Sequence, residues 1–270
     1  PTSSMPHLRG LDGLRGLAVL GVLFFHGGFA WAAGGFLGVS LFFTLSGFLI
    51  TSLLLAEHST NNAVDFRQFY ARRARRLLPA SLLVLLLVVV ARWMGEFRNV
   101  PGLHPDLIGA LLQVFNWVQL AGSSSYGALF GQSAAFTSPL EHYWSLAIEE
   151  QFYLLWPLVV LALLRIGGRI ALGVAAVILG ISSTVWMDTL ATQLGYPERV
   201  DVSRVYFGTD THALGLLAGA ALAAFAQRLT DEEFVRSRRA HAIGFTVGVA
   251  ALLGTFWLFA EMGENSGWLY

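Results

Sequence analysis

Cysteine and lysine are both absent from this chain of 270 residues, and charged residues make up only 13% of it. Without cysteine the chain has no disulfide, no thiolate nucleophile and no cysteine metal ligand, and we expect no metal site. All 17 basic residues are arginine, which excludes a Schiff-base lysine. The scarcity of charge, with 55% hydrophobic residues and a mean hydropathy of +0.61, excludes an ordinary soluble domain.

Several apolar runs approach the roughly 20 residues that are needed to cross a bilayer core. We therefore expect an all-α fold, a polytopic transmembrane helix bundle that forms a single membrane-embedded domain over residues 1–270, with no soluble domain. The expected helices, about eight in number, cover residues 15–33, 36–56, 77–94, 106–121, 140–164, 170–190, 206–227 and 241–262. The first two should form a tight hairpin, because only Gly34 and Gly35 separate them.

Arginine placement predicts the topology. Five arginines between residues 67 and 76 precede the third helix and mark the cytoplasmic side, so the N-terminus also lies inside. The arginine-bearing turns at 165–169 and 228–239 would lie outside if every helix crossed. Both turns lie on the cytoplasmic side if 106–121 dips into the membrane without crossing it. The polar residues Gln113, Asn116 and Gln119 in this segment favour that interpretation.

His26 follows the run 17–25, in which no side chain is polar. An ionisable group in the middle of an apolar helix is costly and indicates function. Eleven residues at about 100° each return to within about 20° of three turns, so Arg15 and His26 share one helix face roughly 16 Å apart. A cation near the membrane edge and a base near its middle suit an anionic ligand that reacts at its inner end. A histidine hydrogen-bonded inside the bundle is the alternative.

The arginines before the third helix are spaced for phosphate binding. On a helix, Arg73 and Arg76 lie three residues apart, as do Arg72 and Arg75, so each pair presents two guanidinium groups on one side. Arginine is the preferred residue for bidentate phosphate contacts. The alternative is that these arginines anchor the topology and contact lipid phosphates.

Two adjacent carboxylates, Glu149 and Glu150, lead with Gln151 into an apolar run. One of them could pair with a buried arginine, orient His26 or accept a substrate proton, and an exposed pair at a helix end is the alternative. We interpret the aromatic residues of the same segment as interfacial: Trp144, Tyr153 and Trp156.

A third polar group opens the expected helix 206–227. Asp210 and His212 either line a polar cavity or cap the helix, with Thr209 or Asp210 at the N-cap position. Arg204 lies just before them.

Five segments together resemble the acyltransferase-3 family of bacterial membrane acyltransferases. They follow one another in the family's order over about residues 8–225: LDGLR at 11–15 with His26, FFTLSGFLIT at 42–51, FYARRARRLLP at 69–79, WSLAIEEQFY at 144–153 and GTDT at 208–211.

The resemblance implies transfer of an acyl group, often acetyl, from cytoplasmic acetyl-CoA to a hydroxyl of a cell-envelope glycan or another acceptor. It implies a bacterial inner-membrane location, no permanently bound cofactor and no nucleic-acid partner. By the same likeness His26 is the essential histidine with Arg15 beside it, and Arg73 and Arg76 are the arginine pair that handles the CoA phosphates.

We expect Arg72 and Arg75 to assist that pair. His26 would act as general base on the acceptor hydroxyl or as a transient acyl carrier, and Glu149 or Glu150 would orient it or compensate its charge. The residues that we assign to substrate binding are Asp12, Ser46, Arg204, Asp210 and His212.

The chain also departs from the family. Many relatives carry arginine at the position of His212, and the family domain has about ten spans, so we expect this chain to lack its C-terminal helices. A separate extracytoplasmic transferase domain or protein could complete the reaction.

Two other functional classes stay open: a proton-coupled transporter or acyl conduit in which His26 and the Glu149–Glu150 pair relay protons, and an inactive fragment that binds a partner. The sequence shows no internal repeat, which counts against a transporter.

Overall fold

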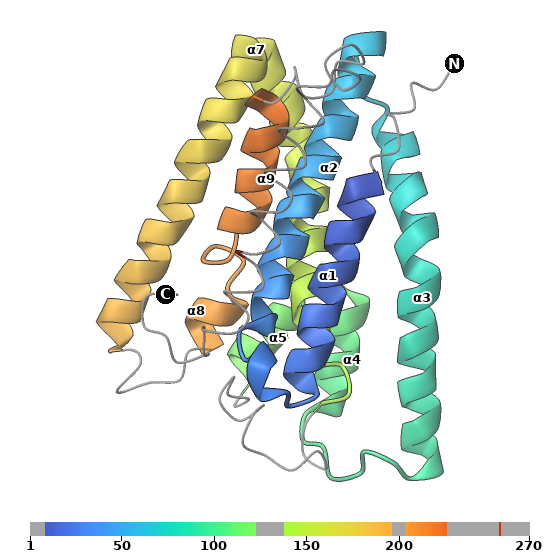
Figure 1. The fold of residues 1–270 in the computed structure, drawn as a ribbon. Coiled ribbons are helices and arrows are strands. Elements are labelled where there is room, and N and C mark those ends of the chain that lie inside the picture. Colours follow the sequence, from blue (N-terminus) through green and yellow to red (C-terminus); the bar gives the residue numbers. More distant parts are fainter. Residues whose placement is uncertain (1–8, 123–137, 196–202, 226–253, 255–270) are drawn as a thin grey trace. The chain divides into compact units, whose positions relative to one another are not determined.

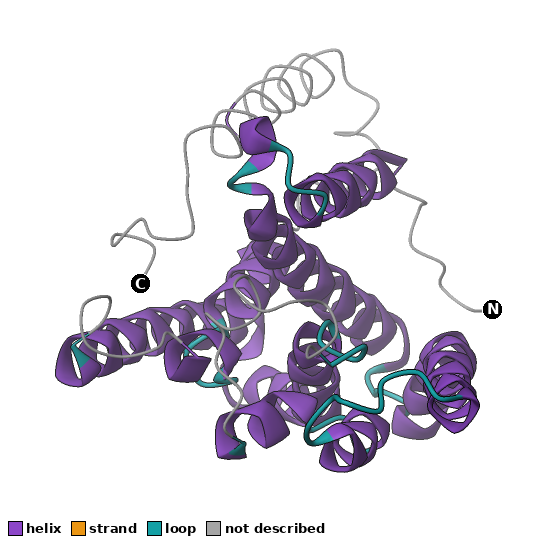
Figure 2. Cartoon of the chain, turned by 90° about the horizontal axis from the view of Figure 1, so that it is seen from below, coloured by secondary structure: helices purple, strands orange, loops and turns teal. Residues whose placement is uncertain are grey.

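The computed structural model of the protein describes residues 9–122, 138–195, 203–225 and 254. In these residues every regular element is a helix and none is a strand (Figures 1 and 2). Among the described residues, three helices are long and apolar enough to cross a membrane: Ala30–Asn61, Phe66–Met94 and Tyr143–Leu194. The all-α prediction is confirmed for this part of the chain, but the predicted number of apolar helices is not. The predicted helix 241–262 lies outside the described residues.

The chain divides into two compact units. The first unit comprises Pro1–Ala56, Leu163–Gly180 and Gly215–Leu269. The second unit comprises Glu57–Ala162 and Ile181–Leu214, with Tyr270.

The first unit begins with a helical hairpin, in which α1 (Arg9–His26) is followed by the 3₁₀ turns η1 (Ala30–Ala32) and η2 (Gly35–Leu37) and by α2 (Gly38–Asn61). A Cβ atom on Gly35 would lie 2.1 Å from the carbonyl oxygen of Gly21, so glycine is what lets the turn close against α1. The two helices form the predicted hairpin, but the prediction that only Gly34 and Gly35 separate them is wrong, because residues 27–37 lie between α1 and α2. The predicted end of the first helix at residue 33 is wrong, because Gly28, with φ of +72°, follows a helix that ends at His26.

Glycines also bring α2 against α9 (Leu214–Phe225) in the first unit. A Cβ on Gly47 would lie 1.9 Å from the Leu216 carbonyl oxygen, and one on Gly219 would lie 2.0 Å from that of Thr44. The two backbones therefore touch directly, the close approach that small residues allow between membrane helices.

The helix α7 (Tyr143–Leu194) is bent where Gly167 and Gly168 leave helical geometry, Gly168 with φ of +66°. The bend separates residues 143–166 from 169–194. These two parts correspond to the helices predicted over 140–164 and 170–190.

In the second unit, α3 (Phe66–Met94) begins at Asp65, whose carboxylate accepts a hydrogen bond from the backbone N–H of Gln68 at 2.9 Å. Only 11% of its most apolar stretch is buried. Such exposure of leucine and valine along one helix is what a lipid-facing surface requires.

The predicted helix 106–121 is not continuous. The structure has α4 (Leu103–Leu111) and α5 (Phe115–Ala121), with Gln113 between them at φ of +58°. Tyr143, the first residue of α7, donates a hydrogen bond to the Ser81 carbonyl at 3.0 Å. Ser81 lies 13 residues, or roughly 20 Å, before the end of α3 at Met94, so α7 begins beside the middle of α3. Whether 106–121 crosses the membrane stays a prediction.

The short helix α8 (Ser203–Phe207) and the loop 208–213 precede α9. This loop lies outside the three long apolar helices and holds the third polar group of the sequence.

Candidate functional site

The four arginines of α3 that are predicted to bind phosphate, residues 72, 73, 75 and 76, have different surroundings. Arg72 forms an ion pair with Glu57 at 3.4 Å. Arg75 and Arg76 are exposed, whereas Arg73 is half-buried. The charge of Arg72 is therefore partly compensated inside the protein, and Arg75 and Arg76 are the guanidinium groups most accessible to an anionic ligand.

Arg73 meets the two carboxylates that the sequence singled out. Its guanidinium carbon lies 3.6 Å from the ring centroid of Tyr153, a cation–π distance. The Tyr153 hydroxyl donates to Glu149 Oε2 at 3.2 Å, and Arg73 interacts electrostatically with Glu150 and Glu149. Tyr153 is 4% exposed, so its interpretation as an interfacial aromatic is wrong, and so is that of Trp156, which is 3% exposed.

A pocket of about 390 Å³ lies in the second unit between α3, the break between α4 and α5, and the first part of α7. Three buried polar atoms of lining residues have no hydrogen-bond partner in the described part of the chain: Arg73 Nε, Gln113 Oε1 and Glu150 Oε1. Buried polar atoms are normally satisfied. The three atoms therefore carry unused hydrogen-bonding capacity inside the protein, on residues that also line the pocket.

Gln113 owes its conformation to a contact with α7. Its positive φ is uncommon for a residue other than glycine. Gln151 Nε2 donates to the Gln113 carbonyl at 3.0 Å, and the next residue, Val114, donates its N–H to the Gly109 carbonyl at 2.8 Å. The left-handed turn is thereby fixed from both sides.

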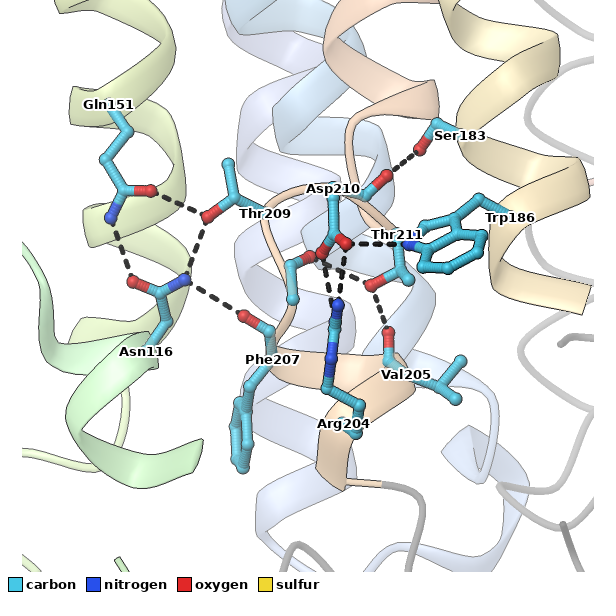
Figure 3. Close-up of polar contacts among 11 residues, drawn as sticks. Asn116, Gln151, Ser183, Trp186, Arg204, Val205, Phe207, Thr209, Asp210 and Thr211 are labelled. Carbon is cyan, nitrogen blue, oxygen red and sulfur yellow. Dashed lines mark hydrogen bonds and ion pairs between the residues drawn. The ribbon is translucent and has the colours of Figure 1, made fainter. Parts of the chain in front are cut away.

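Gln151 is also the centre of a polar network that ties α5 and the loop 208–213 to α7 (Figure 3). Its Nε2 donates to Asn116 Oδ1 at 2.9 Å, and its Oε1 accepts from the Thr209 hydroxyl at 2.6 Å. Asn116 Nδ2 donates to the Phe207 carbonyl at 3.0 Å and to Thr209 Oγ1 at 2.9 Å. Since these groups satisfy one another, this network is structural.

Arg204 and Asp210 form a bidentate ion pair, with nitrogen–oxygen distances of 2.9 and 2.6 Å (Figure 3). Trp186 Nε1 donates to Asp210 Oδ2 at 2.8 Å, and the Ser183 hydroxyl donates to the Asp210 carbonyl at 2.6 Å. Burial alone would raise the pKa of Asp210, but the hydrogen bonds from Arg204 and Trp186 outweigh it, and the pKa lies below its ordinary value.

The alternative that Thr209 or Asp210 is the N-cap of the following helix is wrong, because α9 begins only at Leu214. Both side chains are bonded elsewhere in the loop and its neighbours.

The imidazole of His212 packs among aromatic rings, 5.6 Å from Trp144 and 5.2 Å from Tyr206 between centroids. Burial lowers the pKa of His212 to about 4, so the ring is neutral at pH 7. Trp144 is 5% exposed and belongs to this cluster, so its interpretation as an interfacial aromatic is also wrong.

His26 is the last residue of α1 and is exposed, so its predicted place in the middle of an apolar helix is wrong. Its Nδ1 lies 2.9 Å from the Val22 carbonyl oxygen. Because a carbonyl only accepts, Nδ1 carries the proton in the neutral ring and Nε2 is the basic nitrogen. Arg15 lies on the same helix and is half-buried; that it shares a face with His26 stays a prediction.

The predicted site residues are distributed over both units. Arg73, Glu149 and Glu150 come together in the second unit. The first unit holds the remaining predicted residues of α1 and α2: Asp12, which is exposed, Arg15, His26 and Ser46, which is buried. Sequence reasoning missed the roles of Tyr153, Gln113 and Gln151; their polar groups within apolar runs were the signal that could have found the two glutamines.

Comparison with known proteins places these features in a family. The acyltransferase-3 family model, described as an acyltransferase domain, matches residues 8–270. The peptidoglycan O-acetyltransferase OatA of Listeria monocytogenes is 39% identical over 268 residues, which are 99% of this chain and 42% of OatA. YrhL of Bacillus subtilis, which carries the provisional name of a peptidoglycan O-acetyltransferase, is 43% identical over 80% of this chain and 33% of its own length. The chain thus spans less than half of these relatives, and no solved structure matches it.

Proposed function

Because this chain belongs to the acyltransferase-3 family, we propose that it is an integral membrane O-acyltransferase that moves an acetyl group from cytoplasmic acetyl-CoA to a hydroxyl of a cell-envelope glycan. The observation that carries the proposal is Arg73, held on Tyr153 beside Glu149 and Glu150 at the end of an arginine-rich helix start. Relatives named for peptidoglycan O-acetylation support peptidoglycan as the acceptor class to test first.

The arginines of α3 are proposed to bind the phosphates of the donor. Exposed Arg75 and Arg76 can each offer paired N–H groups, the geometry that phosphate oxygens prefer. Arg73 is fixed by its ring contact and adds charge close by. Arg72 contributes less, since Glu57 already compensates it.

His26 is proposed to perform the chemistry through Nε2, the nitrogen that is basic when Nδ1 donates to Val22. As general base it takes the proton of the acceptor hydroxyl while that oxygen attacks the thioester carbonyl carbon. The carbon–sulfur bond then breaks and the CoA thiolate takes the proton back from the imidazolium. General-base catalysis contributes typically about 10²–10⁴-fold in rate.

A covalent route gives the same overall exchange of thioester and alcohol for ester and thiol. In it, Nε2 of His26 attacks the carbonyl carbon, CoA leaves, and the acetyl-imidazole passes its acetyl group to the acceptor. Arg15, on the same face of α1, is proposed to hold negative charge of the substrate near this histidine.

The two glutamates are proposed to compensate charge, and the remaining predicted residues are divided between substrate binding and a structural role. Glu149 is oriented by Tyr153, and Glu150 faces the pocket that Arg73 lines; either can compensate charge that develops during transfer. Asp12, Ser46 and His212 remain proposed substrate-binding residues. The mutual pairing of Arg204 and Asp210 favours a structural role for these two, described below.

The test is acetyl transfer from radiolabelled acetyl-CoA in proteoliposomes supplied with peptidoglycan fragments. Wild type should transfer label, and Arg73→Ala should raise the KM for acetyl-CoA about tenfold, the loss expected for one charge-assisted contact. Arg98→Ala is the matched control, because this exposed arginine lies beyond the other end of α3. CoA binding without label transfer to any hydroxyl would favour the acyl conduit instead.

A further inference from the structure

Two tryptophans of the second unit are exposed at the surface although their indole N–H groups are bonded within the protein. Trp117 on α5 is 41% exposed, and Trp186 on α7 is 43% exposed. Trp117 Nε1 donates to Gln151 Oε1 at 3.2 Å, and Trp186 Nε1 donates to Asp210 Oδ2 at 2.8 Å. Each ring is therefore held in one orientation while much of its surface stays accessible.

An ion pair links the two rings. The bidentate pair of Arg204 and Asp210 contacts Trp186 through the hydrogen bond to Asp210 (Figure 3). The guanidinium carbon of Arg204 lies 6.0 Å from the centroid of the Trp117 ring, at the outer limit of a cation–π contact. These four residues, Trp117, Trp186, Arg204 and Asp210, form what we call the tryptophan cluster.

Anchoring at the membrane interface is the rival explanation of an exposed tryptophan, and Trp93 shows the difference. Trp93, on the last turn of α3, is 84% exposed, and among the described residues none accepts a hydrogen bond from its N–H. An anchoring ring places its apolar body in lipid and its N–H at the level of the wet headgroups. Trp117 and Trp186 instead donate to side chains of the protein, so contacts with headgroups are not needed to orient them.

The tryptophan cluster offers a ligand contacts of two kinds. The face of an indole ring carries negative partial charge, which attracts the polarised C–H groups on the flat side of a sugar ring. Arg204 directs two N–H groups at Asp210, and a guanidinium has five such donors. Donors therefore remain on a side chain that is 32% exposed, and they suit the hydroxyl groups at the edge of the same sugar ring.

The charge of the cluster favours an uncharged ligand. Arg204 and Asp210 compensate each other, so an anionic ligand meets no unbalanced cation and a cationic ligand meets no unbalanced anion. A neutral, hydroxylated ring with an apolar face matches the remaining contacts. Because the indole rings are fixed before binding, less conformational entropy is lost when a ligand stacks on them.

We propose that the tryptophan cluster binds neutral sugar rings of the acceptor glycan, with Trp117 and Trp186 as the ligand-contacting residues. The Arg204–Asp210 pair holds the cluster together, in keeping with its structural role. This inference rests on the proposed function, because it takes a glycan as the acceptor.

The variants that test the proposal are Trp186→Leu and Trp186→Phe. Both lose the N–H that donates to Asp210 and keep an apolar side chain, but only phenylalanine keeps an aromatic face. A structural role of the N–H predicts the same result from both variants. A stacking role predicts that phenylalanine retains binding that leucine loses. Trp93→Leu is the matched control, because it removes an exposed tryptophan that is not part of the cluster.

The measurement is equilibrium binding of chitotetraose, a neutral oligosaccharide of N-acetylglucosamine, to the whole chain in nanodiscs. We expect Trp186→Leu to weaken binding about tenfold, Trp186→Phe to weaken it less than about threefold, and Trp93→Leu to bind as wild type does. In the acetyl-transfer assay, Trp186→Leu should raise the KM for peptidoglycan fragments by a similar factor and leave the KM for acetyl-CoA unchanged.

Equal losses in Trp186→Leu and Trp186→Phe would overturn the stacking role. Unchanged binding in both variants would assign the rings to membrane anchoring, and wild type that does not bind chitotetraose would also overturn the inference. These outcomes leave the proposed function standing, since label transfer from acetyl-CoA tests it separately. Binding of chitotetraose that depends on the aromatic face, in a protein that transfers no label, would support the glycan site and count against the proposed function alone.

Discussion

Removing the carboxylate of Asp210 should destabilise the protein without requiring any change at the proposed donor site. In the structure both carboxylate oxygens are engaged, by two contacts from Arg204 and one from Trp186. Asp210→Ala breaks all three and leaves the guanidinium of Arg204 without its counter-ion.

The expected size follows from these contacts. A hydrogen bond to a charged group is worth about 1.5–3 kcal/mol net when it is well shielded. The side chains of Arg204 and Asp210 are 32% and 39% exposed, so solvent screening reduces their share. We expect a total loss of about 2–3 kcal/mol, which for a chain of this length lowers the melting temperature by roughly 5–10 °C.

Intrinsic tryptophan fluorescence during heating measures the change, since Trp186 is itself one of the partners. The control is Asp188→Ala, an exposed aspartate two residues from Trp186 on the same helix. The double variant with Arg204→Ala should show a coupling energy of about 1–2 kcal/mol between the pair.

The reasoning is refuted if Asp210→Ala melts as Asp188→Ala does and the coupling is near zero. Loss of acetyl transfer at unchanged stability would then assign Asp210 to substrate binding, which is the reading that the sequence proposed.

Three further predictions concern stability, and melting curves check each. Gly219→Val should lower the melting temperature strongly, because its Cβ would lie 2.0 Å from the Thr44 carbonyl oxygen and α2 and α9 must separate. Gln151→Leu should cost about 1–3 kcal/mol by leaving the buried amide of Asn116 unsatisfied; equal melting of variant and wild type would contradict this. The pKa of His212 is about 4 when folded against about 6.5 unfolded, so the unfolded chain binds the extra proton and stability is lost as pH falls through that window. His212→Phe should remove this acid dependence, and an unchanged pH profile would show that the ring does not titrate as proposed.

Much of the helical framework could be predicted because local chemistry dictates it. Apolar runs placed the turn of the hairpin near Gly35, and they placed the boundary between the predicted helices 140–164 and 170–190 at the bend around Gly168. The break at Gln113 could not be found in the same way, since no glycine or proline marks it. It depends on a hydrogen bond from Gln151, which is 38 residues away in the chain.

The site was predictable in its residue types and not in its contacts. The spacing of Arg73 and Arg76 indicated anion binding, but spacing along one helix says nothing of the partners across it. Tyr153 was interpreted as an interfacial aromatic, and the structure places it beneath Arg73. Arg204 lies in α8 and Asp210 in the loop that follows it. Their pairing could not be predicted, because the backbone of a loop has no regular period from which to infer which side chains meet.

The central claim is that His26 carries out acetyl transfer, and one comparison tests it directly: the rate of label transfer from acetyl-CoA by wild type and by His26→Ala, with CoA affinity measured on the same samples. We predict that His26→Ala binds CoA as wild type does and loses at least about 10²-fold in transfer rate, the lower end of what a general base contributes. Transfer by His26→Ala at the wild-type rate would contradict the mechanism.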